Sequence, residues 1–358
     1  MLNFAIIGTG RISANHIAAA AAMSGEMRLT AVCDILPDNI NTALRNADVP
    51  SDIPKYSNYM KMMDEQRPDV VAIATDSGTH EEIGKHCLAH GAHCIIEKPI
   101  ALSIRGADEL IETAKQHDRV LSVCHQNRFN KGVQKIRKAL DDRRFGKLSH
   151  IAAHVRWNRN EEYYRQADWR GKWASDGGCL MNQCIHAADI MRWFLGDVDE
   201  VFAYMQNARH PYIEGEDIGL ALVRAKSGAL GLFEGTVNVH PSNLEETIYL
   251  FGDNGTAKAA GMALNTIDHW CFADGLDVPE EVINECRELP PNVYGFGHQL
   301  LYKDTVNAIK TGRKPLVDGY EGRNALELVL AMYKSKLTGS PVRLPLNDFA
   351  STDMEGTF

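Results

Sequence analysis

Residues 3–23 read NFAIIGTGRISANHIAAAAAM, and this stretch decides the fold. NFAII is a short apolar run of the kind that a buried parallel strand requires, and an alanine-rich helical stretch follows Ser13. Gly8 and Gly10 therefore fall on a strand-to-helix turn. Because glycine occurs at any turn that needs a positive φ, the two glycines alone do not distinguish a phosphate-binding loop from an ordinary corner.

The next apolar run, LTAVC, ends at Asp34, which lies 24 residues after Gly10. At this spacing an acidic residue reaches the ribose of a dinucleotide whose pyrophosphate lies at the helix N-terminus. We expect Gly8, Gly10, Arg11 and Ile12 to form the phosphate loop. A carboxylate at position 34 repels a 2′-phosphate, which favours NAD over NADP, whereas Arg11 is compatible with both. A strand-end cap or turn role for Asp34 stays open.

Strands and helices alternate through the rest of the first third of the chain. This alternation predicts a parallel, doubly wound sheet whose ligands lie beyond the carboxyl ends of the strands. Polar residues occur at or just after those ends, and we expect Thr75, His80, Glu97, Lys98 and Gln126 to contact the cofactor and Asn127 the substrate. The expected strands are 69–75, 93–99 and 120–126, and the expected helices lie near 57–66, 79–90 and 103–117.

Length, charge and cysteine usage exclude several classes of protein. A chain of 358 residues is longer than one hydrophobic core supports, so two domains are expected. A net charge of −9 argues against a nucleic-acid-binding protein. No apolar run is long enough to span a membrane, and the N-terminus does not resemble a signal peptide. The eight cysteines are dispersed, which favours reduced thiols in the cytoplasm.

Lys98 lies in the triplet Glu97–Lys98–Pro99 at the end of an expected buried strand. A partly desolvated lysine has a lowered pKa and is able to exchange a proton with a reacting hydroxyl. The alternative is a strand-end lysine that reaches solvent.

Residues 173–197, WASDGGCLMNQCIHAADIMRWFLGD, predict one amphipathic helix after Gly178. Asn182 and His186 share a face of this helix one turn apart. His186 is a candidate general base, and Asn182 a candidate partner for a substrate hydroxyl. Two alternatives remain: a buried histidine with satisfied hydrogen bonds, or a metal site. We expect no metal, because the spacing of the residues concerned matches no closed zinc site; these are Cys179, Cys184, His186 and Asp189.

Five basic residues interleaved with aromatic ones precede this helix. Such a cluster suits a diphosphate and a stacked base or sugar, and we expect Arg159, Tyr163 and Tyr164 to bind substrate. A solvated loop or a subunit contact is the alternative. The basic residues are Arg156, Arg159, Arg165, Arg170 and Lys172, and the aromatic ones are Trp157, Tyr163, Tyr164 and Trp169.

Four motifs in order, GTGRIS with Asp34, EKP, NRF at 127–129 and DGGCLMNQCIHAAD, resemble those of the Gfo/Idh/MocA oxidoreductases over nearly the whole chain. The resemblance implies an α/β fold, with an NAD-binding Rossmann domain over 1–123. It implies a substrate-binding and oligomerisation domain over 124–358, with a large, open, mostly antiparallel sheet. A homo-oligomer, dimer or tetramer, follows from the family. One departure is that Asp76 and Ser77 replace the family's usual proline and asparagine, although His80 keeps its place.

Within the family, residues 155–178, MNQCIH at 181–186 and residues 243–270 are similar to UDP-N-acetylglucosaminuronate (UDP-GlcNAcA) 3-dehydrogenases of surface-polysaccharide synthesis. Inositol and simple-sugar members often have aspartate where Asn182 stands, and a neutral amide does not repel a uronate carboxylate. The resemblance implies that Lys98 and His186 act on a sugar hydroxyl, at C3, while NAD accepts the hydride. Which of the two takes the proton stays open, as does the physiological direction.

Two other functions remain compatible with the sequence. The first keeps the chemistry and changes the substrate, as in an inositol or free-sugar dehydrogenase or a keto-sugar reductase. The second is a non-catalytic NAD-binding sensor, against which the presence of both Lys98 and His186 argues.

Overall fold

The computed structural model describes residues 1–47, 52–288 and 295–358, which form two compact units. Unit 1 comprises Met1–Cys124 with His298–Arg323, and unit 2 comprises His125–Gly297 with Asn324–Phe358. The first boundary lies one residue from the expected division at 123, but the return of 298–323 to unit 1 was not expected. This segment contains α11 (Gly297–Thr311), whose Thr305 hydroxyl donates to Ser122 Oγ at 3.0 Å.

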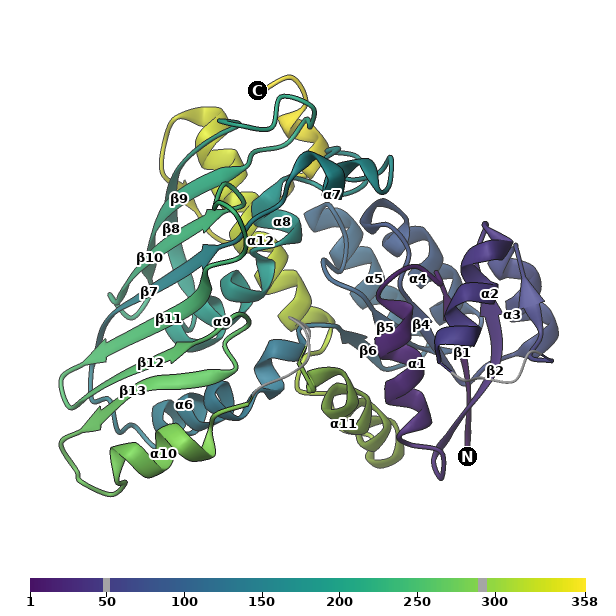
Figure 1. Cartoon of the computed structure of the whole chain (residues 1–358), viewed down its shortest axis with the longest axis horizontal. Coiled ribbons are helices and arrows are strands. Elements are labelled where there is room, and N and C mark those ends of the chain that lie inside the picture. Colours follow the sequence, from purple (N-terminus) through teal and green to yellow (C-terminus); the bar gives the residue numbers. More distant parts are fainter. Residues whose placement is uncertain (48–51, 289–294) are drawn as a thin grey trace. The chain divides into compact units, whose positions relative to one another are not determined.

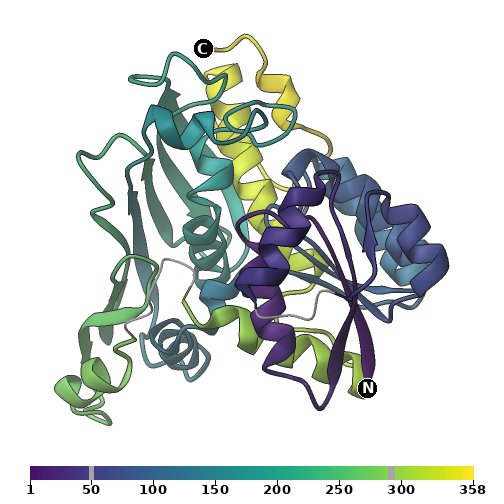
Figure 2. The ribbon, with the colours of Figure 1, turned by 45° about the vertical axis from the view of Figure 1, so that its right-hand side comes forward.

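Unit 1 is built on the predicted parallel sheet, whose six strands run in the order β3-β2-β1-β4-β5-β6. Phe4, Ala5 and Ile6 in β1 are fully buried, because helices cover both faces. Figure 2 shows α1 and the pair α4 and α5 on opposite sides of the strands. The strands are β1 (Leu2–Ile7), β2 (Met27–Cys33), β3 (Lys55–Tyr56), β4 (Val70–Ile73), β5 (His93–Ile96) and β6 (Leu121–Val123).

Besides α11, the helices of unit 1 lie close to the expected ranges, with the exception of α2. They are α1 (Ser13–Ala21), α2 (Pro37–Asn46), α3 (Tyr59–Gln66), α4 (His80–Ala89) and α5 (Ile104–Gln116). The sequence pattern did not indicate α2 and the two-residue strand β3. The observed strands β4, β5 and β6 are shorter than predicted, because the regular strand pairing ends within or at the end of each apolar run.

Unit 2 contains the predicted large, mostly antiparallel sheet (Figure 1). Its order is β13-β12-β11-β7-β10-β9-β8-β14, and β7 and β10 are its one parallel pair among the described strands. Asp253 and Asn254 join β11 to β12, which begins at Gly255, so the NG pair lies at a turn as expected from the sequence. The strands are β7 (Leu148–Arg156), β8 (Val198–Gln206), β9 (Ile218–Ala225), β10 (Leu230–Thr236), β11 (Glu245–Gly252), β12 (Gly255–Ala260), β13 (Thr266–Phe272) and β14 (Val342–Arg343).

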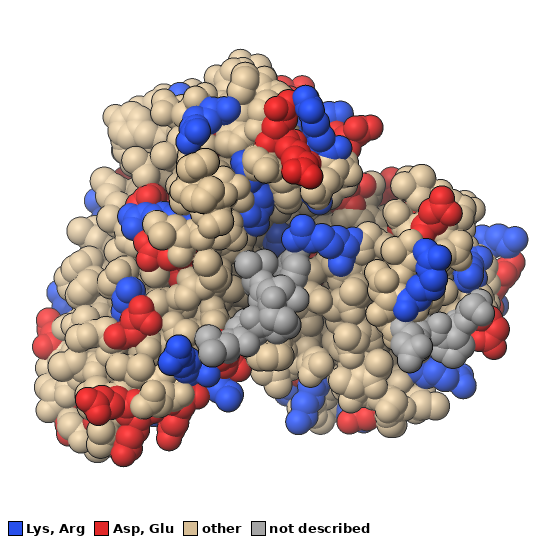
Figure 3. Space-filling model, viewed as in Figure 1, with Lys and Arg blue, Asp and Glu red and all other residues tan. Residues whose placement is uncertain are grey.

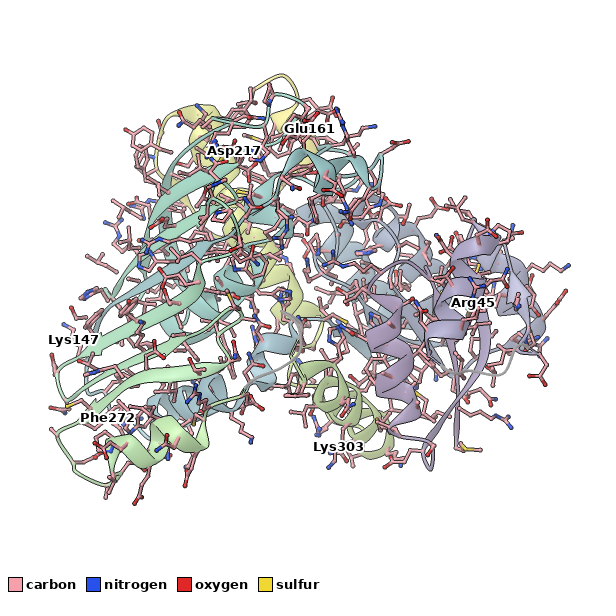
Figure 4. The ribbon with its side chains drawn as sticks, viewed as in Figure 1. Arg45, Lys147, Glu161, Asp217, Phe272 and Lys303 are labelled. Carbon is pink, nitrogen blue, oxygen red and sulfur yellow. The ribbon has the colours of Figure 1, made fainter. Side chains whose placement is uncertain are left out.

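Helices cover one face of this sheet. In Figure 1, α9 and α12 pack behind the strands. Figure 4 marks the two ends of the sheet: Glu161 and Asp217 lie at one end, and Lys147 and Phe272 lie at the other. The helices of unit 2 are α6 (Lys131–Asp141), α7 (Glu161–Arg165), α8 (Cys179–Asn182), α9 (Ile185–Leu195), α10 (Pro279–Glu285) and α12 (Gly319–Thr338), the last of which begins in unit 1.

The surface and the thiols agree with the composition. On the face drawn in Figure 3, acidic and basic side chains are interspersed. All eight cysteines are free thiols, and Cys271 is the exposed one. Within the described ranges, no helix combines the length and the apolar character needed to cross a membrane.

Candidate active site

The glycines of the N-terminal turn differ in what surrounds them. Gly8 has φ +89°, and a Cβ there would lie 2.5 Å from the backbone carbonyl of Ala74, so no other residue fits. A Cβ at Gly10 would meet nothing within 4 Å, which leaves its backbone open to a ligand. Ser13 begins α1, and its hydroxyl donates to the Gly10 carbonyl at 2.7 Å. The turn therefore presents an open backbone at the positive end of a helix.

Asp34 lies beside this turn, directly after β2. Its Oδ2 accepts hydrogen bonds from the backbone and hydroxyl of Thr9, at 2.7 and 3.0 Å. Its Oδ1 accepts from the Leu36 backbone at 2.8 Å. The turn role that the sequence left open is thus present, and the carboxylate also borders the phosphate loop.

Thr75 and His80 follow β4. The Thr79 hydroxyl donates to Thr75 Oγ1 at 2.8 Å. His80 is buried, and its Nδ1 lies 2.8 Å from the carbonyl oxygen of Pro99. Burial lowers the pKa of His80, so the neutral ring carries its proton on Nδ1 and donates to that carbonyl. The His80 side chain therefore supports the residue after Lys98, and its predicted contact with the cofactor stays a prediction.

Glu97 and Lys98 extend from the carboxyl end of β5. The Glu97 side chain points inward, where its Oε1 lies 3.0 Å from His16 Nε2 and 3.4 Å from His298 Nε2. Its Oε2 accepts from the Lys98 backbone at 3.2 Å. The Lys98–Pro99 peptide bond is cis.

The residues of unit 1 fit a dinucleotide. The open backbone at Gly10 and the adjacent α1 N-terminus suit a pyrophosphate, with Arg11 and Ile12 completing the turn. Asp34 supplies acceptors for a ribose. The end of β5 places Lys98 at the carboxyl edge of the sheet, where ligands of such sheets bind.

Unit 2 carries the second set of predicted residues, on two helices instead of the expected one. Helix α8 ends at Asn182 and α9 begins at Ile185. The break arises because the Cys179 carbonyl accepts from both Gln183 and Cys184, at 2.9 and 3.0 Å. Asn182 and His186 are consequently not one regular helical turn apart, and the prediction of a continuous helix was wrong.

His186 lies among other polar residues of unit 2. Its Nε2 is 3.5 Å from Gln126 Nε2, and its ring packs edge-on against His125 with centroids 5.6 Å apart. Asp189, one turn later, is engaged by Arg128, whose Nε and terminal nitrogen donate to its two oxygens at 2.8 and 2.6 Å. The two side chains are buried, so the pair fixes the NRF segment against α9.

A buried acid explains the diglycine before α8. Glu216 Oε1 accepts from the Leu180 backbone at 2.8 Å and from the Tyr333 hydroxyl at 3.0 Å. A Cβ at Gly178 would lie 1.6 Å from Glu216 Oε2, so the glycine makes room for the cap. Burial raises the pKa of Glu216 to about 8. Sequence reasoning missed Glu216 and Tyr333, because nothing in their local sequence indicates contact with α8.

Part of the predicted basic cluster forms a stack at the Glu161 end of the sheet. The Arg159 guanidinium lies 5.0 Å from the ring centroids of Trp157 and Tyr163. Arg170 lies 4.0 Å from the Tyr163 ring. We call Trp157, Arg159, Tyr163 and Arg170 the cation–aromatic stack.

Three nitrogens in the stack are buried without a partner among the described residues: Trp157 Nε1, Arg159 Nε and Arg170 Nε. Each is a hydrogen-bond donor, so the stack offers donors and positive charge to an anionic group. The stack is also linked to the helix segment, because Gln183 donates to the Tyr163 hydroxyl at 3.2 Å.

Other predicted residues are placed differently. Arg156 does not join the stack, because it lies on β7 and pairs with Glu234 and Glu245. Tyr164 is buried, and its ring packs against Tyr163, His210 and Tyr212. Its contact with the substrate stays a prediction.

The two remaining predicted substrate contacts are hydrogen-bonded or buried within unit 2. Asn182 donates to Asp176 from its side-chain amide. Asn127 is buried in the short 3₁₀ helix at Gln126–Phe129.

Comparison with known proteins identifies the family. Residues 2–125 match the model for the oxidoreductase family with an NAD-binding Rossmann fold, and residues 133–258 match the GFO/IDH/MocA C-terminal domain. The chain is 24% identical over 348 residues to the myo-inositol 2-dehydrogenase of Thermotoga maritima, covering 93% of this chain and 96% of that protein.

Two solved structures are more similar over the full length. The WlbA dehydrogenase of Bordetella pertussis, in complex with NADH and UDP-GlcNAcA, is 35% identical, with a TM-score of 0.90 over 97% of this chain and 98% of that one. The Chromobacterium violaceum WlbA dehydrogenase, in complex with the same two ligands, is also 35% identical, with a TM-score of 0.88 over 97% and 96%. The chain is therefore an NAD-dependent oxidoreductase of the Gfo/Idh/MocA family.

Proposed function

We propose that the enzyme oxidises a ring hydroxyl, at C3, of UDP-GlcNAcA in surface-polysaccharide synthesis, and that it does so in the cytoplasm. The observation that carries this proposal is the 35% identity, over 97% of the chain, to two dehydrogenases described in complex with NADH and UDP-GlcNAcA. That likeness extends through both units, so it includes the part of the chain in which substrate residues were predicted.

Lys98 and His186 carry the proton chemistry in this proposal. Oxidation of a carbinol removes a proton from oxygen and a hydride from carbon, and bound NAD supplies the hydride acceptor. The Lys98 amine and the His186 imidazole are two groups of suitable chemistry. One takes the hydroxyl proton while the other donates a hydrogen bond to the same oxygen.

The cation–aromatic stack supports a nucleotide-linked substrate over a free sugar. A diphosphate supplies acceptors for the buried donors of Arg159 and Arg170, which have no partner among the described residues. The aromatic members offer faces for a uracil or a sugar. Binding the nucleotide tail would orient the sugar and so lower the barrier at its reacting carbon.

The amide at position 182 supports a uronate. Asn182 adds no negative charge of its own, whereas an aspartate would repel a substrate carboxylate.

A panel of sugars tests the proposal. Purified enzyme and NAD are mixed with one sugar at a time, and NADH fluorescence is recorded. The sugars are UDP-GlcNAcA, UDP-GlcNAc, free N-acetylglucosaminuronate and myo-inositol. We expect turnover with UDP-GlcNAcA and a kcat/KM at least about 100-fold lower for the free sugars, since the nucleotide tail provides binding energy. A preference for myo-inositol would replace the proposed substrate, and NAD binding without any turnover would indicate a sensor.

We also propose that the enzyme is a homo-oligomer whose copies meet at the uncovered face of the large sheet. Tyr204, Leu222 and Leu230 on this face are 70%, 61% and 55% exposed. Strand register makes the apolar residues contiguous, because Tyr204 pairs with Leu220 and Leu222 with Leu232. An apolar face of this kind is a frequent site of protein association.

A further inference from the structure

A buried polar cluster in unit 1 has no part in the reaction described above. Its members are His16 on α1, Glu97 after β5, Cys124 after β6, and His298 and Tyr302 on α11. Each of these residues is buried, with an exposed fraction between 0 and 7%. His16 Nδ1 lies 2.8 Å from the Tyr302 hydroxyl oxygen, and His16 Nε2 lies 3.0 Å from Glu97 Oε1.

The protonation states of the cluster follow from its geometry. Burial favours the neutral form of Glu97, but the hydrogen bonds from His16 and His298 outweigh it and hold the pKa of the carboxyl well below its usual range. Burial lowers the pKa of His16 and raises those of the Cys124 thiol and the Tyr302 phenol. Glu97 is therefore a carboxylate beside a neutral His16, Cys124 and Tyr302.

The proton positions then form a directed chain. A carboxylate only accepts hydrogen bonds, so His16 carries its proton on Nε2 and donates it to Glu97. Its Nδ1 is then an acceptor, and the Tyr302 hydroxyl donates to it. His298 also donates from Nε2 to Glu97 Oε1, at 3.4 Å. The chain runs from α11 through α1 to the end of β5.

Cys124 connects the chain to Lys98. Burial raises the pKa of the Cys124 thiol, the Glu97 carboxylate raises it further, and Lys98 lowers it, so both side chains act on one sulfur. Glu97 also accepts from the Lys98 backbone at 3.2 Å. The ionised Glu97 carboxylate therefore contacts the Lys98 backbone directly, and it shares an electrostatic neighbour, Cys124, with the Lys98 side chain.

We propose that His16, Glu97 and Tyr302 are positioning residues for Lys98: the hydrogen-bond chain fixes the Glu97 carboxylate, which holds the end of β5 and sets the proton affinity of the Lys98 amine. This proposal rests on the proposed function of Lys98 in proton transfer. His80 faces the same carboxylate, and its neutral ring leaves Glu97 as the anion of the cluster.

Some of the same atoms could instead bind a metal ion, and an experiment must distinguish this metal site from the hydrogen-bond chain. One nitrogen of His16, one oxygen of Glu97 and the sulfur of Cys124 all lie within 4.8 Å of one another, which is also compatible with a transition metal. The hydrogen-bond chain is favoured because His16 and Glu97 are already at hydrogen-bond distance and each has a suitable partner.

A titration of Lys98 tests the proposal without any sugar. Lysines are reductively methylated with ¹³C-formaldehyde, the Lys98 signal is assigned with Lys98→Arg, and its shift is followed against pH by NMR. In Glu97→Gln we expect the Lys98 titration to move to lower pH, because the neighbouring anion is gone. Glu109→Gln, at a carboxylate paired with Lys85 and Arg105, is the matched control and should leave it unchanged.

The kinetic test uses Tyr302→Phe, which keeps the edge-on ring contact with Phe4 and removes the hydroxyl donor. We expect kcat to fall roughly fivefold to tenfold, as for the loss of one hydrogen bond, with the KM for NAD little changed. Thermal unfolding shows whether each variant is folded.

Three results would overturn the proposal. The first is an unshifted Lys98 titration in folded Glu97→Gln. The second is an unchanged kcat in Tyr302→Phe. The third is one equivalent of zinc in the purified protein, bound through Cys124. If the wild-type enzyme does not oxidise the nucleotide sugar, the proposed substrate is wrong, but the NMR titration still decides the role of Glu97.

Discussion

Single residues in this chain serve the fold and the site at once. The Asp34 carboxylate holds Thr9 and Leu36 through three hydrogen bonds of 2.7 to 3.0 Å, and the same oxygens border the place where a ribose is expected. His80 similarly supports the Pro99 carbonyl next to Lys98. In both cases the sequence motif identified the residue, whereas only the structure shows its hydrogen-bond partners.

Lys98 and His186 are the residues on which the proposed chemistry depends. Replacement by Lys98→Met or His186→Asn should lower kcat by at least about 100-fold, because general acid–base groups contribute this much. The affinity for NAD should change little, since neither side chain forms the phosphate loop. Stopped-flow turnover and NAD titration measure the two effects.

Lys303→Met is the matched control for the lysine variant, because Lys303 is exposed on α11 of the same unit. Wild-type turnover in both active-site variants would remove these residues from the mechanism.

Glu246 on β11 predicts a pH-dependent stability. It is 1% exposed, and neither carboxyl oxygen has a partner among the described residues. Burial raises its pKa from 4.5 to about 8. Between these two values the unfolded chain releases a proton that the folded chain retains, so the contribution of Glu246 to stability is present below about pH 4.5 and is lost as the pH rises toward 8.

Glu246→Gln lacks this titration. As the pH is raised from 5 to 8, the free energy of unfolding of the variant should therefore increase relative to that of the wild type. The increase is on the order of 3 kcal/mol. Urea unfolding at the two pH values measures the change, and Glu280→Gln, at an exposed glutamate of the same unit, should show none. An equal effect of Glu246→Gln at both pH values would mean that Glu246 is ionised in the folded protein.

At the scale of elements, the segment between Gly177 and Leu195 depends on contacts from distant parts of the chain. Glu216 precedes β9 and Tyr333 lies on α12, yet the two together cap α8. Gly178 is required because its missing side chain leaves the space that the Glu216 carboxyl occupies. Gly178 is therefore a packing requirement at the start of α8.

Gly178→Ala should destabilise the protein by about 1–3 kcal/mol, because the added methyl group overlaps a buried carboxyl that has little room to move. Gly25→Ala is the matched control, since a Cβ there meets nothing within 4 Å. Thermal and urea unfolding give the comparison. A Gly178→Ala variant as stable as Gly25→Ala would show that Glu216 is free to shift.

Elements with strong local patterns were predictable from the sequence. Apolar runs identified β1, β2 and β4 to β6, and turn residues identified the β11–β12 hairpin. The break between α8 and α9 was not predictable, because the apolar spacing through Cys184 is continuous and the break depends on two donors sharing the Cys179 carbonyl. Local sequence also could not show that Arg156 pairs across strands with Glu234 and Glu245 instead of joining the cation–aromatic stack.

At the scale of the whole molecule, the uncovered face of the large sheet is the feature that most needs a partner. Leu222 is at the centre of its apolar residues, since it pairs with Phe202 on one side and Leu232 on the other. The resemblance to the family predicts that a second copy covers this face.

Leu222→Lys should therefore lower the oligomeric state, because a charge buried in an apolar interface is costly. Analytical ultracentrifugation measures the mass. Leu276→Lys, at a residue that is 75% exposed on a loop of the same unit, is the control and should not change it. A monomeric wild-type protein, or an unchanged oligomer in Leu222→Lys, would contradict this use of the sheet.

The central claim of the proposed mechanism is that Lys98 and His186 both act on the same sugar hydroxyl. A crystal structure of the enzyme with NADH and UDP-GlcNAcA tests this claim most directly. We predict that Lys98 Nζ and His186 Nε2 both lie about 3 Å from the C3 hydroxyl oxygen, within hydrogen-bond reach. A complex in which either nitrogen lies more than about 6 Å from that oxygen, with no water between them, would contradict the account.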